Sequence, residues 1–402
     1  MHFGKTGWGT GLVAVLVAAI PLATPAHAAL GDWALAPPSF AVGSAELRLN
    51  GAANGALFSP HQPGWRGAQA SGAFLFMPQL RRDYDSGLSL ALNGTFAAAD
   101  PLSRGRYDGD VIERLSASAR TGLGTLEIGI SAGAGTALAA GGPKVDAAVS
   151  LDNPRTSFHR DPGTGRAVRA LFPLRTQVSA SSNYAKFVYT SPSLFGAQLA
   201  LSFAPTEGKQ LPFLDAGPDV PGRQATFWEA ALRYETEFAG AGIAASAAVS
   251  ESRGERKLPG QQGTSDFGFG LRVDYPLTEE LTASLGGAWR QSNAYAFNVK
   301  QTWQPSITRA QHASAMLGDG VWRLGVEYGN GVAKEVGIAG LPRLGLNGWQ
   351  ASAGYRLSPS LNVSAGWQRL GYGRNAGNFF SGTPQLKMDA VFLNLSLQTS
   401  EQ

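Results

Sequence analysis

Apolar and polar residues alternate in sixteen short segments distributed along this chain. In the clearest of them, Phe267, Phe269 and Leu271 share one face, while Arg272 and Asp274 share the other. Alternation with a period of two is typical of β-strands that bury or expose one apolar face. The pattern therefore predicts an all-β protein.

The predicted strands follow one another in hairpin order. They span residues 44–56, 67–80, 87–96, 110–120, 125–131, 183–191, 196–204, 225–236, 242–252, 264–275, 281–291, 308–317, 321–329, 346–357, 361–370 and 386–398. Tight turns at 121–124, 191–195, 277–280, 318–320 and 357–360 alternate with longer connections at 97–109, 205–224, 253–263, 292–307, 330–345 and 371–385. In one strand, 308–317, Gln311, His312 and Ser314 interrupt the alternation.

A sheet with one apolar face can span a membrane if it closes on itself. In bilayer hydrocarbon every backbone N–H and C=O must be paired within the protein, so a spanning sheet closes into a barrel. An even strand number, with short turns at one end and long loops at the other, is typical of bacterial barrels. We therefore predict a 16-stranded antiparallel transmembrane β-barrel. The alternative, a soluble secreted β-sandwich, predicts a protein that stays in solution without detergent.

Aromatic residues at both ends of the apolar stripes support the membrane interpretation. The pairs are Trp228 and Tyr234, Phe267 and Tyr275, Trp322 and Tyr328, and Trp349 and Tyr355. At about 3.3 Å per residue the members of a pair stand roughly 20 to 26 Å apart along the strand. This is near the height of a lipid-facing band bordered by aromatic girdles.

The N-terminus has the pattern of a secretory signal. Lys5 precedes an apolar run at residues 11–20, followed by the small-residue site Ala26-His27-Ala28. The run is about half the roughly 20 residues that a helix needs to span a bilayer. We predict a signal peptide at 1–28 and one barrel domain at 29–402. Glycines and charges interrupt every later apolar run, and the mean hydropathy is −0.08, which excludes a conventional helical membrane protein.

Composition excludes several other classes of protein. The chain has no cysteine, so disulfide-stapled folds, thiolate metal sites and cysteine nucleophiles are excluded. The net charge of +4 is small and the basic residues are scattered, so nucleic acid is not an expected partner. Acidic residues are spread singly over different loops, and no phosphate-binding glycine motif is present. We expect neither a metal nor a cofactor.

A catalytic alternative rests on His312 and Ser314, which share a strand face. Some outer-membrane barrels are lipid hydrolases that use a serine and a histidine. Here the pair has no G-x-S-x-G elbow and no convincing acidic partner in the sequence. The sequence therefore predicts that the protein is not an enzyme.

One connection, residues 132–182, is far longer than the others and has no strand pattern. On either side of it the sequence resembles the general porins of Gram-negative outer membranes. Residues 184–196 contain the S-P-S-x-x-G turn that follows the constriction loop of that family, and residues 122–129 are similar to the turn and strand that lead into the loop. The resemblance covers nearly the whole chain after residue 28.

The resemblance implies a function and a location. It implies a homotrimeric channel of the outer membrane, through which small hydrophilic solutes and ions diffuse passively, with 132–182 folded into the lumen as the third loop. Family members usually end on an aromatic residue that the barrel-assembly machinery reads. Here residues 398–402 follow Leu397, so Phe392 is the candidate remnant of that signal.

The resemblance also implies which residues line the pore. A barrel of sixteen strands is too wide to be filled by its own side chains, and in the family acidic loop residues face basic residues of the wall across the narrowest point. The acidic candidates on the loop are Asp146, Asp152 and Asp161, and the basic candidates are Arg48, Arg114, Arg120, Arg175 and Lys186. Rings of charge bias which ions pass, and the modest basic excess predicts a weak anion preference. The alternative is that these residues are solvated in the lumen without selecting ions.

Two further interpretations remain open. The first is a substrate-specific channel, and the second is a barrel that serves adhesion or binding through its long loops. A specific sugar channel of the related eighteen-strand kind would need two more strands and aromatic residues lined up in the lumen. The aromatic candidates, Trp303, Phe379 and Phe380, fall in predicted outer loops.

Overall fold

The computed structural model describes residues 34–61, 67–99, 112–152, 174–181, 183–206, 224–254, 263–293, 306–335, 344–373 and 386–399. The predicted signal peptide at 1–28 lies outside these residues. Within them are seventeen strands and one four-residue helix, α2, at Ala134–Ala137. Among the described residues, no helix is both long enough and apolar enough to cross a bilayer.

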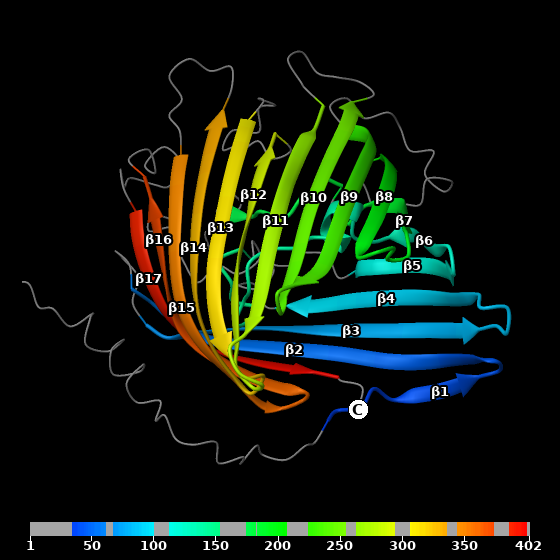
Figure 1. The fold of residues 1–402 in the computed structure, drawn as a ribbon, viewed down its shortest axis with the longest axis horizontal. Helices are drawn as coiled ribbons and strands as arrows, with labels where there is room; N and C mark the ends of the chain where they lie inside the picture. Colours follow the sequence, from blue (N-terminus) through cyan, green and yellow to red (C-terminus); the bar gives the residue numbers. More distant parts are fainter. Residues whose placement is uncertain are drawn as a thin grey trace, which may run out of the picture.

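Sixteen of the strands form the wall. They are β2 (Ala45–His61), β3 (Gln69–Asp83), β4 (Ser89–Ala99), β5 (Ile112–Thr121), β6 (Gly124–Ile130), β7 (Ala185–Thr190), β8 (Ala197–Thr206), β9 (Gln224–Phe238), β10 (Ala241–Gly254), β11 (Ser265–Pro276), β12 (Thr282–Ser292), β13 (Ser306–Gly318), β14 (Trp322–Glu335), β15 (Leu344–Ser358), β16 (Leu361–Tyr372) and β17 (Leu386–Gln398). Each predicted strand overlaps one of these, so the sixteen-strand prediction is confirmed. Figure 1 shows the strands side by side around the wall.

The wall closes on itself. Every strand from β2 to β17 pairs antiparallel with its neighbours in sequence, and β17 pairs with β2 from Gln398↔Ala52 to Asp389↔His61. Closure leaves no unpaired edge between these strands, as a spanning sheet requires. One short strand was not predicted: β1 (Ser39–Val42) pairs with the first residues of β2.

The strands meet in tight turns at one end of the barrel, as predicted. We call this the short-turn end; it includes the turns 84–88, 122–123, 239–240, 277–281, 319–321 and 359–360. Ala239 and Gly240 both have positive φ, 51° and 79°, which suits the twist of a two-residue hairpin between β9 and β10. The connections at the opposite end run through residues outside the described ranges, apart from parts of 132–182.

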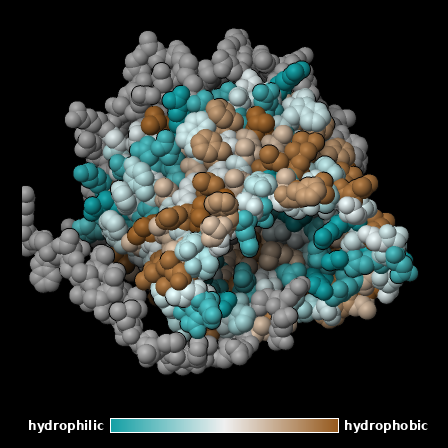
Figure 2. Space-filling view, viewed as in Figure 1, coloured by the Kyte–Doolittle hydropathy of each residue, from teal (hydrophilic) through white to brown (hydrophobic). Residues whose placement is uncertain are grey.

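The wall has apolar side chains outside and polar side chains inside. Trp228, Phe269 and Leu285 expose about three fifths of their surface, whereas Asp266 and Arg290 on the opposite face are buried within the barrel. Figure 2 shows hydrophobic side chains gathered across the middle of the visible outer face. Such an arrangement is suited to a hydrocarbon exterior. The same arrangement explains the interrupted alternation of strand β13: Gln311 points outward among the apolar residues, while His312 points inward.

Buried apolar contacts lie between the wall and the segment 132–182. Phe58 of β2 and Phe392 of β17 point inward and pack with Val149. Phe392 is only 2% exposed, so in this structure it belongs to the inner packing of the barrel. Leu151 and Leu174 lie against β15 at Gly348, where a Cβ would be only 3.0 Å and 3.2 Å from their methyl carbons.

Candidate functional site

The described parts of the segment 132–182, which we call the inner loop, lie against the inside of the wall. Near its start, the backbone N–H of Ala134 donates to Ser202 Oγ of β8 at 3.1 Å, and that of Ala140 donates to Ser246 Oγ of β10 at 2.8 Å. Asp146 accepts hydrogen bonds from Ser364 of β16 and Asn394 of β17. The inner loop therefore follows the wall from β8 round to β17, inside the ring of strands (Figure 1).

The small residues of the inner loop permit this close approach. A Cβ on Gly142 would lie 2.1 Å from Ser314 Oγ of β13. On the wall side, a Cβ on Gly270 of β11 would lie 1.9 Å from the carbonyl oxygen of Ala140. Only glycine fits at such contacts. The run Ala132–Gly142 thus lets the loop backbone and the sheet backbone touch.

Three buried carboxylates of the wall hold the inner loop. Glu229 of β9 accepts from the backbone N–H groups of Gly135 (3.4 Å) and Ser181 (3.0 Å), one near each end of the loop. Asp266 of β11 accepts from the backbone N–H of Ser179 at 3.3 Å and is paired with Arg290. All three carboxylates are at most 3% exposed.

Glu327 of β14 is the third carboxylate, and it holds the middle of the loop. It accepts from Ser150 Oγ at 2.6 Å and from the backbone N–H of Leu151 at 3.1 Å. On the wall it is bonded to His312 Nε2 (3.0 Å) and Gln350 Nε2 (3.1 Å). Hydrogen bonds to a charged acceptor are roughly twice as strong as neutral ones, so these side chains fix the loop in place.

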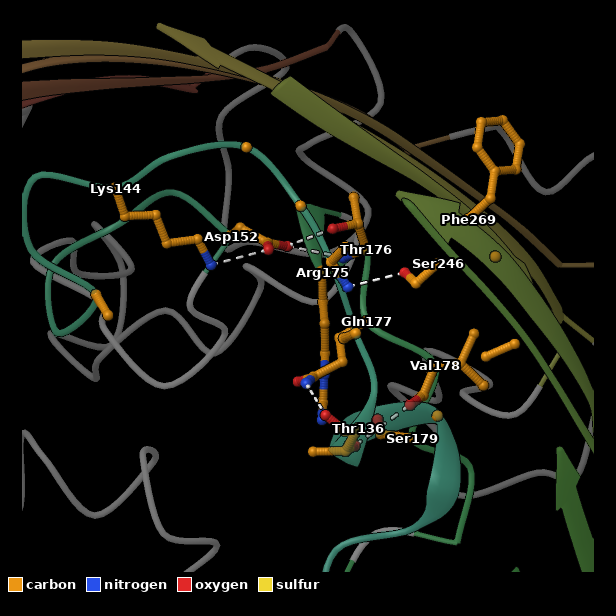
Figure 3. A pocket seen from close by; sticks show the side chains of 18 of the residues that line it. Thr136, Lys144, Asp152, Arg175, Thr176, Gln177, Val178, Ser179, Ser246 and Phe269 are labelled. Carbon is orange, nitrogen blue, oxygen red and sulfur yellow. Dashed lines mark hydrogen bonds and ion pairs between the residues drawn. The ribbon is translucent and has the colours of Figure 1, made fainter. Parts of the chain in front are cut away.

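A cavity of about 580 Å³ lies between the inner loop and the strands on both sides of the lumen. Its lining includes Leu75 of β3 on one side and Ser246 of β10 on the other. Since β3 and β10 are seven strands apart in a ring of sixteen, the cavity spans the lumen. Figure 3 shows that the loop contributes most of the charged and polar side chains around it.

Among the described residues, the charged groups that line the cavity are Lys144, Asp152 and Arg175, all on the inner loop. Lys144 Nζ lies 3.0 Å from Asp152 Oδ2, and the backbone N–H and the hydroxyl of Thr176 both donate to Asp152 Oδ1 at 2.8 Å (Figure 3). Burial alone would raise the pKa of Asp152, but the positive charge of Lys144 and the bonds from Thr176 hold that pKa below its ordinary value of 3.8. Asp152 is therefore an anion at neutral pH.

The acidic candidates of the loop do not lie in one common place. Asp152 lines the cavity, as does the basic candidate Arg175. Asp146 lies against the wall at β16 and β17, where its carboxylate is occupied by hydrogen bonds. Asp161 lies outside the described residues.

The basic candidates of the wall do not gather at the cavity. Arg48 is paired with Glu46 at 3.0 Å. It lies four residues from Ala52, the register partner of the cavity residue Leu75. Arg48 is therefore about 13 Å from the level of Leu75 along the strand, toward the short-turn end. Arg120 stands next to a short turn and Arg114 is paired with Glu127.

Lys186 occupies a different environment from the other basic candidates. It is fully buried and donates to the carbonyl and hydroxyl oxygens of Ser181 at the end of the inner loop. Its ammonium group therefore does not face the open lumen. That the candidates act together as a constriction stays a prediction.

Sequence reasoning missed the residues that position the loop. Glu229 and Glu327 are acidic residues at inward positions in mid-strand, and Asp266 is at an inward position near the start of β11; this placement was the available signal. The missing acidic partner of His312 is also Glu327, so the expectation that none exists was wrong. Both His312 and Ser314 are buried on the inner wall beneath the loop, away from the lipid-facing surface.

Comparisons with known proteins agree with this architecture. A family model described as Gram-negative porin matches residues 13–379. No curated protein sequence matches the chain. The structure is similar to OmpF of Salmonella typhi in complex with daunomycin, with a TM-score of 0.55 and 12% identity over 90% of this chain and 100% of that one.

Two other solved structures show the same likeness. For OmpT of Vibrio cholerae the TM-score is 0.53 and the identity 8%, over 90% of this chain and 99% of that one. For the anion-selective porin of Comamonas acidovorans the TM-score is 0.52 and the identity 9%, over 88% and 99% of the two chains. At these identities the likeness shows the shared fold.

Proposed function

Because the chain belongs to the Gram-negative porin family, and is thus an outer-membrane channel for passive diffusion and no enzyme, we propose that small hydrophilic solutes and ions cross it with a weak anion preference. The opening lies between the inner loop and β3. The observation that carries this proposal is the cavity that spans the lumen, with Leu75 on one side and loop charges on the other. Within the part of the chain that the structure describes, this cavity is the space through which a solute would pass the inner loop.

The charge balance of the cavity supports the anion preference. Within the described part of the lining, Lys144 and Arg175 carry two positive charges and Asp152 carries one negative charge. Charges that line a narrow pore bias the ions that pass. The balance of one positive charge favours anions modestly, because the ion pair of Lys144 and Asp152 cancels most of its own field at a distance.

The remaining candidates complete the proposed pore lining. Asp146 shapes the electric field beside β17. Asp161, which lies outside the described residues, stays a candidate. Arg114 lies near the start of β5, away from the short-turn end, whereas Arg48 and Arg120 lie toward the short-turn end. Lys186 supports the loop from beneath, through Ser181.

The outer surface defines the other proposed partners. Outward apolar stripes would contact outer-membrane lipid, and part of them would be buried between the three subunits of a homotrimer. A trimer form is known for the similar OmpT of Vibrio cholerae, at a TM-score of 0.51. We propose that the barrel-assembly machinery recognises strand β17.

The reversal potential in a KCl gradient across a planar bilayer tests the proposal. Wild-type protein should show a small potential of the sign expected for anions, and Arg175→Gln and Lys144→Gln should each move it toward cation preference. Lys387→Gln is the matched control, because Lys387 is exposed on the outward face of β17 and should leave the potential unchanged. A clear cation preference of the wild type would contradict the proposed selectivity.

Concentration dependence separates a general pore from a substrate-specific channel. A general pore should carry a current that rises linearly with solute concentration. Saturation by a single solute would instead indicate a specific binding site and overturn the proposal of a general pore.

A further inference from the structure

Four strands carry an arginine and a carboxylate two residues apart at the short-turn end of the barrel. Residues two apart on a strand share a face, and in all four cases this is the inward face. The pairs are Arg48 with Glu46 on β2, Arg81 with Asp83 on β3, Arg233 with Glu235 on β9 and Arg272 with Asp274 on β11. We call these eight residues the charge girdle.

Each pair is a formed ion pair that water still reaches. The Nε atoms of Arg48 and Arg81 lie 3.0 Å from their partner carboxylate oxygens, and that of Arg233 lies 2.8 Å from Glu235 Oε1. In the fourth pair, Arg272 Nε lies 2.8 Å from Asp274 Oδ2. The eight side chains are between 29% and 61% exposed, so a solute in the lumen can touch them.

The pairs share one polarity. In β2, Glu46 lies nearer the start of the strand at the short-turn end, and Arg48 lies deeper. In β3, β9 and β11 the chain runs the other way, and the order of the residues is reversed with it, so that the carboxylate is again nearer the turn. In each strand of the girdle the carboxylate therefore stands nearer the turn, and the guanidinium group lies deeper along that strand.

The pairs also face one another across the opening. Strands β2 and β3 are neighbours, and Glu46 is the register partner of Arg81. Strands β9 and β11 lie about half of the sixteen-strand ring away from them. On each wall the charges alternate between strands, because Glu46 stands level with Arg81, and Glu235 and Arg272 are both register partners of Ala244. Both walls of the opening therefore present carboxylates beside guanidinium groups.

We infer that the charge girdle is a weak recognition site for zwitterionic solutes, compounds that carry a carboxylate and an ammonium group a few ångströms apart. A guanidinium group offers five N–H donors and a carboxylate offers several lone pairs, and girdle groups bond to third partners: Arg233 also donates to the carbonyl oxygen of Ala139, and Asp274 also accepts from Ser284. A zwitterion can place its carboxylate at a guanidinium group and its ammonium group at a neighbouring carboxylate. An ion with a single charge meets attraction at one member of each pair and repulsion at the other.

Liposome swelling with two isomers tests this inference, which rests on the proposed channel function. Alanine is a zwitterion, and lactamide is its uncharged isomer, so the two have the same mass and nearly the same size. Wild-type channels should admit alanine about two- to threefold faster, relative to lactamide, than a variant with E46Q, D83N, E235Q and D274N. That factor is the scale of solvent-exposed ion pairs. A variant in which all four pairs are exchanged, for example E46R with R48E, keeps both kinds of charge and should keep the advantage.

The outcomes separate the two proposals. If lactamide enters and the ratio of alanine to lactamide is the same in all three proteins, the girdle does not recognise zwitterions and the inference fails while the channel stands. If neither isomer enters liposomes that contain folded wild-type protein, the proposed channel function itself fails. Heat-dependent mobility on a gel shows for each variant that the barrel is folded.

Discussion

The position of the inner loop should depend more on the buried Glu327 of the wall than on the exposed residues of the loop itself. Replacing Glu327 with alanine removes the acceptor of four hydrogen bonds, two of which come from the loop, at Ser150 and Leu151. The other two come from the wall, at His312 and Gln350. Glu327→Ala therefore leaves buried donors without an acceptor and detaches the middle of the loop from β14.

The size of the effect follows from those two loop contacts. A hydrogen bond to a charged group contributes roughly 1.5–3 kcal/mol, so the loop contact weakens by about 3–6 kcal/mol in the variant. Since 1.4 kcal/mol corresponds to a factor of ten, even the lower figure raises the ratio of detached to attached loop by roughly a hundredfold. Glu229 and Asp266 still hold the two ends, so the expected motion is confined to the middle of the loop.

Single-channel recording measures this motion. Glu327→Ala should give noisy current with brief partial closures, and Glu327→Gln, which keeps one carbonyl acceptor, should give a smaller effect. Asp389→Ala is the control, because Asp389 pairs with Arg369 on the outer face of the wall, the face opposite to the described parts of the loop. If folded Glu327→Ala channels are as quiet as the wild type and conduct equally, Glu327 does not position the loop.

Three further predictions concern the packing and charge of the inner loop. Phe392→Ala opens a space beneath Val149 and should destabilise the barrel by about 3–5 kcal/mol, measured as a lower temperature of heat-dependent gel mobility; an unchanged temperature would contradict the buried position of Phe392. Because the pKa of Asp152 is lowered, its anionic contacts contribute stability above its ordinary value of 3.8 and lose it as pH falls through the lower value. Conductance of the wild type should therefore be constant from pH 7 to about pH 5. Asp152→Asn at neutral pH should behave as the wild type does in strong acid. A change in wild-type conductance near pH 6 would refute this. Gly270→Ala should push Ala140 toward the lumen and lower the conductance, whereas an unaltered conductance would show that the loop does not touch β11 there.

The strands could be predicted because each carries its own evidence. A residue such as Phe269 and its neighbours two positions away must face the same side of a sheet, so alternation determines both the strand and its outward face. Strand β1 escaped prediction because its four residues are exposed and too few to show a period. Helix α2 is equally short and consists of small residues.

The inner loop could be located from the sequence but its attachments could not. Its length and position were visible, yet the bond between Leu151 and Glu327 joins residues 176 positions apart, and no local pattern encodes such a pairing. Lys186 has the inward parity expected of a pore residue, but parity does not show that Ser181 covers it. By contrast, the pairing of Arg48 with Glu46 is a two-residue spacing that the sequence does contain.

Liposomes that hold the purified protein provide the most direct test of the account, whose central claim is a barrel with an apolar exterior around an aqueous lumen. Swelling rates should be high for the smallest sugars and fall steadily as sugars become larger, because the inner loop leaves only part of the lumen open. Liposomes that contain the folded barrel and yet remain closed to the smallest sugars would contradict the claim.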